Sequence, residues 1–154
     1  MRVRGKIVPG VFRGEQLIDK YTPRLRGLLG FDPFRGTLNV KMERKIDLKF
    51  FATKTLEHIL LDGSRHVDAY LAPVKLYTLN GDCPCWVIRP VSSAHEGYVH
   101  GADTIELIAK ENLRKKFSLK DDDAVELEFE GVAPKEVRES ILGRLTRSET
   151  RLSR

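Results

Sequence analysis

Apolar and polar residues alternate in two stretches, one beside the N-terminus and one ending at residue 130. A period of two places successive side chains on opposite faces of a strand, so each stretch predicts a half-buried strand with a charged outer face. The positions expected to face inward are Val3, Gly5, Ile7, Val125, Leu127 and Phe129. Leu38, Val40 and Met42 alternate with polar residues in the same way and predict a further strand.

Other apolar runs are short and are separated by Pro, Gly or Asn-Gly, residues that interrupt regular structure. These runs cover residues 66–71, 74–77, 85–89 and 104–109. Many short strands with few helices favour a small β-barrel and disfavour a parallel α/β fold. The predicted fold class is therefore mainly β with short helices.

Helical spacing is confined to short segments. Thr22 and Pro23 are typical of an N-cap followed by proline in the first turn, and Gly30 marks the end of that helix. The stretch before it, from Pro9-Gly10 through Gly14 and Glu15, is expected to be a loop. Leu113 and Phe117 lie four residues apart and predict a second short helix, which is basic.

The length of 154 residues and the hydrophobic content of 41% suit one compact domain. We expect a barrel domain over residues 1–130 and a C-terminal tail over residues 131–154. The tail begins with apolar residues at helical spacing and ends in a polar segment that is expected to fray. The apolar residues of the tail are Val137, Ile141, Leu142 and Leu145.

The net charge of +5 is compatible with a nucleic-acid partner, so the position of the charges matters. Residues 131–154 contain six Lys or Arg and three Asp or Glu, whereas residues 1–130 are nearly balanced, with 21 and 19. A tail of mixed sign is more often a solvated helix face than a phosphate contact. Aromatic and basic residues do not alternate as on a single-strand binding platform. Nucleic acid is therefore not the expected partner.

The longest apolar runs are far shorter than the roughly 20 residues that a membrane span needs, so no membrane crossing is expected. The N-terminal residues lack the continuous apolar core and cleavage site of a secretory signal, which predicts a cytoplasmic protein. Cys83 and Cys85 are separated only by Pro84, a spacing that disfavours a disulfide between them. We therefore expect two reduced thiols, without a complete zinc site.

Polar residues that suit a ligand interrupt two of the predicted strands. Thr37 and Asn39 share one face of the strand that contains Leu38, so two neutral oxygen donors face one space. Magnesium is usually held by few protein oxygens together with substrate phosphates, although Thr and Asn beside a turn are more often capping residues. Glu106 lies opposite Ile105 and Leu107, where its carboxylate faces either a polar ligand or water.

The segment after the first strand contains two glycines. Residues 10–15 read Gly-Val-Phe-Arg-Gly-Glu, in which the glycines allow backbone amides to approach phosphate oxygens and Arg13 offers a planar cation. No Gly-Lys-Ser/Thr follows, so the segment is not a Walker loop, and a plain connecting loop is the alternative.

Taken in order, these segments resemble the archaeal CTP-dependent riboflavin kinases from near the start of the chain to about residue 130. The specific part is residues 29–40, Leu-Gly-Phe-Asp-Pro-Phe-Arg-Gly-Thr-Leu-Asn-Val. It is followed by Ile105-Glu106-Leu107-Ile108-Ala109, by Leu113-Arg114 and by Leu119-Lys120-Asp121. Phe12 stands where the family usually has glycine, and Asp121-Asp122-Asp123 replaces a more usual Asp-Gly-Asp turn.

The resemblance implies a six-stranded cradle-loop β-barrel that transfers the γ-phosphoryl group of CTP to riboflavin, giving FMN and CDP. It implies Mg²⁺ at Thr37 and Asn39, and flavin contacts at Glu106 and, by ungapped counting, at Tyr98. No general base is assigned. The nucleotide contacts that it implies are Gly10, Val11, Phe12, Arg13, Gly14, Glu15, Glu111, Asn112, Leu113 and Arg114.

Two alternatives remain open on the sequence. One is a non-catalytic small barrel that binds nucleic acid or acts as a regulatory module. The other is a catalytically inactive relative that still binds flavin or nucleotide, which turnover measured alongside binding would distinguish.

Overall fold

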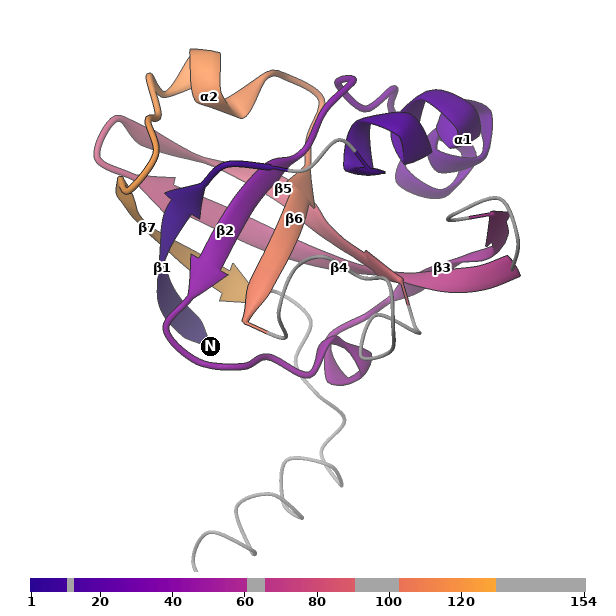
Figure 1. Ribbon diagram of the computed structural model, residues 1–154, viewed down its shortest axis with the longest axis horizontal. Coiled ribbons are helices and arrows are strands. Elements are labelled where there is room, and N and C mark those ends of the chain that lie inside the picture. The colour runs from indigo at the N-terminus through magenta and orange to yellow at the C-terminus, as the bar shows by residue number, and fades with distance from the viewer. Residues whose placement is uncertain (11–12, 61–65, 91–102, 130–154) are drawn as a thin grey trace, which may run out of the picture.

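Antiparallel strands are the main regular structure among the described residues of the computed structural model (Figure 1). The structure describes residues 1–10, 13–60, 66–90 and 103–129, with the backbone alone for residues 13–17. The elements in chain order are β1 (Arg2–Val8), α1 (Arg13–Leu29), β2 (Leu38–Met42), a 3₁₀ turn (Leu48–Phe50), β3 (Lys54–Leu60), β4 (His66–Thr78), β5 (Gly81–Pro90), β6 (Thr104–Ile108), α2 (Leu113–Lys116) and β7 (Ala124–Phe129).

Six of the described strands form a closed ring. Their order is β4-β5-β6-β2-β1-β7, and pairing between β7 and β4 completes the circle. β3 pairs with β4 outside the ring and forms an extra edge strand. Closure leaves the ring strands without a long free edge, as in other small barrels. The prediction of a mainly β, six-stranded barrel is thereby confirmed.

The barrel interior is apolar because the strands alternate as the sequence predicts. Val3, Ile7, Val125, Leu127 and Phe129 are all buried in one core cluster. A second cluster lies outside the ring, where α1 covers the β3–β6 part of the sheet. It contains Ile18, Leu25, Leu56, Ile59, Ala69, Leu71, Ile88 and Ile108.

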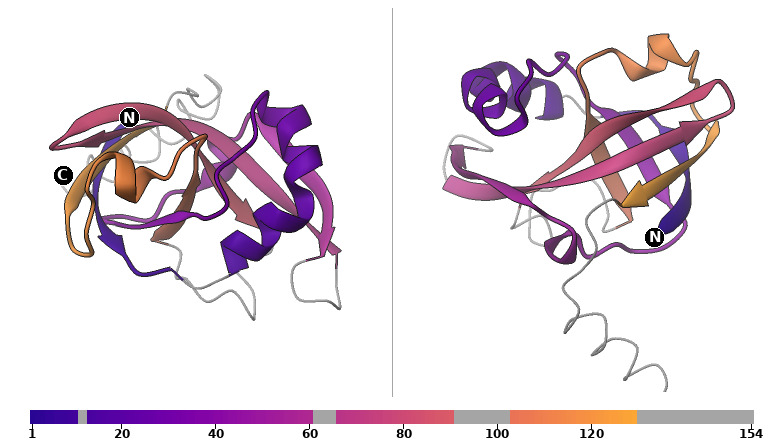
Figure 2. Two further views of the ribbon diagram at one scale, coloured as in Figure 1. Left: turned by 90° about the horizontal axis from the view of Figure 1, so that it is seen from above. Right: turned by 180° about the vertical axis from the view of Figure 1, so that it is seen from behind.

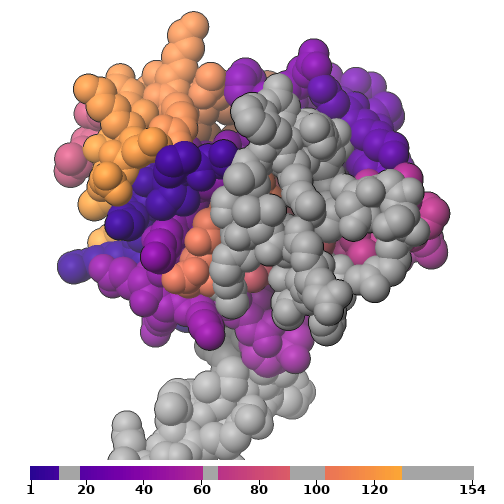
Figure 3. Space-filling view, viewed as in Figure 1, coloured from indigo at the N-terminus to yellow at the C-terminus, as the bar shows by residue number. Residues whose placement is uncertain are grey.

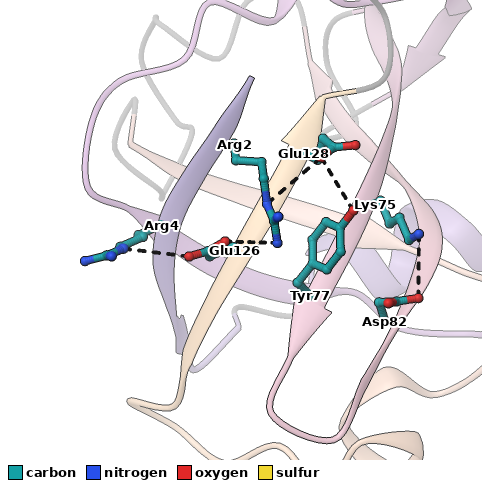
Figure 4. Close-up of polar contacts among 7 residues, drawn as sticks. All are labelled: Arg2, Arg4, Lys75, Tyr77, Asp82, Glu126 and Glu128. Carbon is teal, nitrogen blue, oxygen red and sulfur yellow. Dashed lines mark hydrogen bonds and ion pairs between the residues drawn. The ribbon is translucent and has the colours of Figure 1, made fainter.

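The outer face of the strands that close the ring is polar (Figure 4). Arg2 lies 3.2 Å from the carboxylate of Glu126, and its guanidinium stacks 3.8 Å from the centroid of the Tyr77 ring. Arg4 pairs with the same glutamate, while the Tyr77 hydroxyl donates a hydrogen bond to Glu128. The cations of β1 therefore face carboxylates of β7, which leaves little net positive charge on this face.

β4 crosses a proline that was expected to separate two strands. The sequence predicts separate runs at residues 66–71 and 74–77, but the strand continues from His66 to Thr78. β3 pairs with β4 up to Leu71, and β7 pairs with it from Val74 onward. Pro73 therefore lies where the partner of β4 on this edge changes from β3 to β7. The backbone N–H that proline lacks is not needed there for hydrogen bonds to either strand.

α1 begins earlier than predicted. The loop expected through Gly14 and Glu15 ends at Arg13, where helical structure starts. A kink at Tyr21 (φ −114°, ψ 16°) divides the helix, and the predicted segment from Thr22 forms its second half. Gly30, at φ +82°, ends the helix as expected. β3 was not predicted, because a bulge between Leu56 and Ile59 interrupts its alternation.

α1 and α2 lie at the same end of the barrel, a relationship visible in all three ribbon views (Figures 1 and 2). In the space-filling view they form two separate protrusions at that end (Figure 3). None of the described helices has the length and apolar character of a transmembrane span. The predicted tail over residues 131–154 lies outside the described residues.

Candidate active site

Three polar side chains meet on the outer face of β2 and β6. The register of these antiparallel strands places Asn39 directly opposite Glu106, with Thr37 two residues before Asn39 on the same face. The Thr37 hydroxyl donates a hydrogen bond to Glu106 Oε1 at 3.1 Å, and Asn39 Nδ2 lies 3.5 Å from Thr37 Oγ1. Residues 69 positions apart thus form one cluster, which we call the oxygen cluster.

The oxygen cluster is largely removed from solvent. Asn39 is 2% exposed and Glu106 is 5% exposed. Among the described residues nothing donates a hydrogen bond to Asn39 Oδ1, although this atom is buried. An orphaned buried acceptor costs roughly 1–3 kcal/mol, so Asn39 Oδ1 is available to a donor or a cation that the described residues do not supply.

Gly10 covers the cluster from the end of β1. β1 pairs with β2 so that Val8 lies opposite Asn39, and the chain then passes directly over the amide. A Cβ atom at Gly10 would come within 2.3 Å of Asn39 Nδ2. Only glycine permits this close approach of backbone to side chain.

A cavity of about 180 Å³ opens beside the oxygen cluster. Thr37 belongs to both the cavity and the cluster, because it lines the cavity and donates a hydrogen bond to Glu106. The remaining lining residues come from the segment before β2, from β2 and β6, and from the start of α2. They are Phe34, Gly36, Leu38, Leu107, Ala109, Glu111, Asn112, Leu113 and Arg114.

The α2 side of the cavity is held by its own polar contacts. Asn112 caps the helix by accepting a hydrogen bond from the Lys115 backbone N–H at 3.3 Å. Arg114 donates hydrogen bonds to the Val8 carbonyl at 3.1 Å and to Asp121 at 2.8 Å. Arg114 therefore connects α2 to the end of β1, two residues before Gly10.

Glu111 has a charged neighbour at the cavity rim. Its carboxylate lies 2.9 Å from Lys116 Nζ, and the hydrogen bond between these side chains raises the pKa of Lys116. Lys116 is therefore a cation at neutral pH. Both charges lie at the surface, so this pair contributes little to stability.

Ion pairs attach α1 to the segment that leads into Thr37. Arg35 Nη2 donates to Asp19 at 2.6 Å, and a second contact between the two side chains makes the pair bidentate. Arg26 pairs with Asp32 in the same region. Exposed pairs of this kind stabilise weakly on their own, but bidentate geometry favours one orientation of the connection.

The structure brings together most of the predicted site residues that it describes. Thr37, Asn39 and Glu106 form the oxygen cluster, Gly10 covers it, and residues 111–114 line the adjoining cavity. Arg13, Gly14 and Glu15 form the start of α1, and only their backbone is described. Val11, Phe12 and Tyr98 lie outside the described residues.

The sequence reasoning missed the contribution of Phe34 and Gly36 to the cavity. Both lie inside the family-like segment of residues 29–40, in the turn-rich stretch that precedes Thr37. An aromatic residue in a turn-rich stretch was the available signal, since an apolar ring there has no strand or helix face to join.

The chemistry of the oxygen cluster fits Mg²⁺. Threonine hydroxyl, asparagine carbonyl and carboxylate oxygens are ligands that this ion accepts, and Asn39 Oδ1 supplies an acceptor otherwise unused among the described residues. Within the described part of the chain no group of three or more His, Cys, Asp or Glu side chains gathers as a metal site. A cation here would therefore rely on the oxygens of Thr37 and Asn39, with the Glu106 carboxylate beside them, and on oxygens from a substrate.

These features define a small β-barrel with a candidate ligand site at one end, where Gly10, the oxygen cluster and the cavity lie together. Comparison with known proteins then identifies the family. The family model for CTP-dependent riboflavin kinases, described as domain of unknown function DUF120, matches residues 7–129. The chain belongs to this family, as the resemblance predicts.

Relatives of established name agree with the family match. A riboflavin kinase of Methanococcus vannielii is 28% identical over 130 residues, which cover 82% of this chain and 96% of the relative. A riboflavin kinase of Saccharolobus solfataricus is 32% identical over 140 residues, covering 83% and 73%. A riboflavin kinase of Staphylothermus marinus is 32% identical over 134 residues, covering 82% and 90%. Family membership makes this chain a kinase.

Proposed function

We propose that the protein transfers the γ-phosphoryl group of CTP to the 5′-hydroxyl of riboflavin, giving FMN and CDP. The observation that carries this proposal is the position of Thr37, which lines the cavity and also donates a hydrogen bond to Glu106. A nucleotide in the cavity and a flavin at Glu106 would therefore meet at Thr37 and Asn39. Phosphoryl transfer depends mainly on such positioning and on stabilisation of charge.

The nucleotide would occupy two regions of the chain. Residues 111–114 line the cavity and suit the nucleoside, while Gly10 lies against Asn39 and residues 13–15 form the first turn of α1. The backbone N–H groups of a helix start have no partner within the helix, and the helix dipole favours an anion there. The phosphates would therefore extend from the cavity across Thr37 towards Gly10.

Thr37 and Asn39 would hold Mg²⁺. When bound, the ion neutralises phosphate charge and orients the phosphates. Asn39 contributes the buried oxygen that lacks a hydrogen-bond donor among the described residues. Because the Thr37 hydroxyl donates its hydrogen to Glu106, the lone pairs of Oγ1 point away from that carboxylate and remain available as acceptors.

Glu106 would hold a polar edge of the flavin. Its carboxylate is buried at the junction of β2 and β6, so a hydrogen bond from a ligand there is little weakened by water. No residue is assigned as general base. In a loose transition state the hydroxyl proton leaves late, so positioning alone accounts for much of the rate.

The deciding experiment supplies the purified chain with riboflavin, MgCl₂ and either CTP or ATP, and detects FMN and the nucleoside diphosphate by mass spectrometry. We expect FMN and CDP in equal amounts, with far slower turnover of ATP because a small cavity excludes a purine by size. Equal or faster turnover with ATP would contradict the nucleotide assignment. Binding of both substrates without FMN would identify a catalytically inactive relative.

A further inference from the structure

Phe34 exposes an aromatic ring inside the cavity, and none of the roles above uses it. It is 40% exposed, which makes it one of only three large apolar side chains classed as exposed among the described residues. The other two, Met1 and Leu79, do not line this cavity. Singly exposed apolar side chains are common, but one that lines a cavity is available to a ligand bound there.

The backbone of Phe34 is attached to the end of β6, and its ring lies beside a glycine. The Phe34 N–H donates a hydrogen bond to the Ala109 carbonyl at 2.7 Å, which attaches this segment to the end of β6. Gly36 adopts φ +153°, and a Cβ atom there would lie 3.3 Å from Phe34 Cε1. The ring thus lies beside the bare backbone of Gly36, where a larger residue would crowd it.

The rest of the cavity suits a flat heterocycle. Leu107, Ala109 and Leu113 provide apolar walls, whereas Glu111, Asn112 and Arg114 provide polar groups at one side. Apolar walls around a few convergent polar groups are typical of small-molecule sites, and nucleobases combine apolar faces with a polar edge. The volume of about 180 Å³ is below the roughly 300–1,000 Å³ of sites for drug-sized ligands, so it suits one ring better than a tricyclic flavin.

We propose that Phe34 stacks on the pyrimidine ring of the donor nucleotide and is a specificity-determining residue of this kinase. This inference rests on the proposed function, because it requires that a cytidine nucleotide occupy the cavity. Stacking of a base on an aromatic side chain accounts for roughly 1–3 kcal/mol by alanine substitution, which corresponds to about a 5- to 150-fold change in Kd.

The test measures binding of CDP, of inorganic triphosphate and of riboflavin separately by calorimetry in the presence of MgCl₂. Phe34→Ala is expected to weaken CDP binding by roughly 5- to 150-fold while the affinities for triphosphate and riboflavin change less than about twofold. Phe34→Tyr keeps the aromatic face and should bind CDP nearly as well as the original chain. Phe34→Leu keeps apolar bulk without the π-face and should fall between them.

Leu79→Ala is the matched control, because Leu79 is 98% exposed and lies outside the cavity. Leu79→Ala should bind CDP, inorganic triphosphate and riboflavin with unchanged affinities. CDP affinity that is unchanged in Phe34→Ala would overturn the stacking role, and a loss confined to riboflavin would assign the ring to the flavin. If the original chain forms FMN from CTP but Phe34→Ala binds CDP with the same affinity as the original chain, only this inference fails. If the original chain neither binds CDP nor uses CTP, the proposed function fails with it.

Discussion

Gly10 and Asn39 are in such close contact that a Cβ atom on Gly10 would lie 2.3 Å from Asn39 Nδ2. The segment that would bind phosphate therefore rests directly on a residue that would bind the metal. Since Asn39 lies within a paired strand and is 2% exposed, it has little room to move aside. This contact determines how the two parts of the site are placed relative to one another.

Gly10→Ala is expected to lower turnover strongly, because the added methyl group displaces either the loop or the Asn39 amide. A misplacement of about 1 Å at a reacting site can reduce rate on the order of 100-fold. Steady-state kinetics with CTP and riboflavin provide the measurement, together with a thermal unfolding curve. Gly27→Ala is the matched control, since nothing lies within 4 Å of its added Cβ. Equal activity of Gly10→Ala and the original chain would show that the close contact is not required.

Asn39→Ala is expected to impair the response to magnesium without unfolding the barrel. The change removes a buried oxygen that lacks a donor among the described residues, which offsets the loss of the long Nδ2–Thr37 contact and of buried volume, so the free energy of unfolding should change little. The MgCl₂ concentration that gives half-maximal turnover should be at least ~10-fold higher than in the original chain. Loss of residues that support a metal site has effects of this size. Lys41→Ala, on the same strand and exposed, is the control. Activity lost only together with the thermal transition would make Asn39 structural.

Glu106→Gln is expected to weaken riboflavin binding and to leave CDP binding nearly unchanged. Glutamine retains an oxygen that can accept the Thr37 hydrogen bond, but it loses the charge and presents a donor in place of the second oxygen. A hydrogen bond to a charged group contributes about 1.5–3 kcal/mol, so riboflavin affinity should fall by that amount. Separate calorimetric titrations provide the measurement. Weakened CDP with unchanged riboflavin would place Glu106 in the nucleotide site.

The Cys83 thiol is expected to react slowly with iodoacetamide in the folded chain. Burial raises its pKa above the ordinary thiol value, an effect that nearby Lys116 opposes and that Glu111 and Asp82 reinforce. The folded chain therefore holds the thiol proton more tightly than the unfolded chain does. The stability that this difference contributes is present at low pH and is lost as pH rises above the ordinary thiol pKa. Alkylation rates across pH, measured in Cys85→Ala, should show a midpoint above that value. A midpoint at the value of the denatured chain would contradict the assignment.

The amino-acid sequence alone determined which residues face the barrel interior. Alternation along β1, β2 and β7 predicted the buried side of each strand, because a period of two can be read locally. The end of α1 at Gly30 and the short helix at Leu113 also followed from local signals, a left-handed glycine and a four-residue spacing. The ordered segment over residues 29–40 was specific enough to indicate the family.

The tertiary structure decided which of these elements meet. Pro73 is a break in the sequence and a strand residue in the fold, since β4 exchanges β3 for β7 at that point. Thr37 and Glu106 were assigned to different ligands, yet the β2–β6 register places them 3.1 Å apart. The cavity beside Phe34 likewise requires α2 and β6 to lie against the segment before β2. Such relationships depend on contacts between distant parts of the chain, whereas periodicity and turn chemistry report only on neighbouring residues.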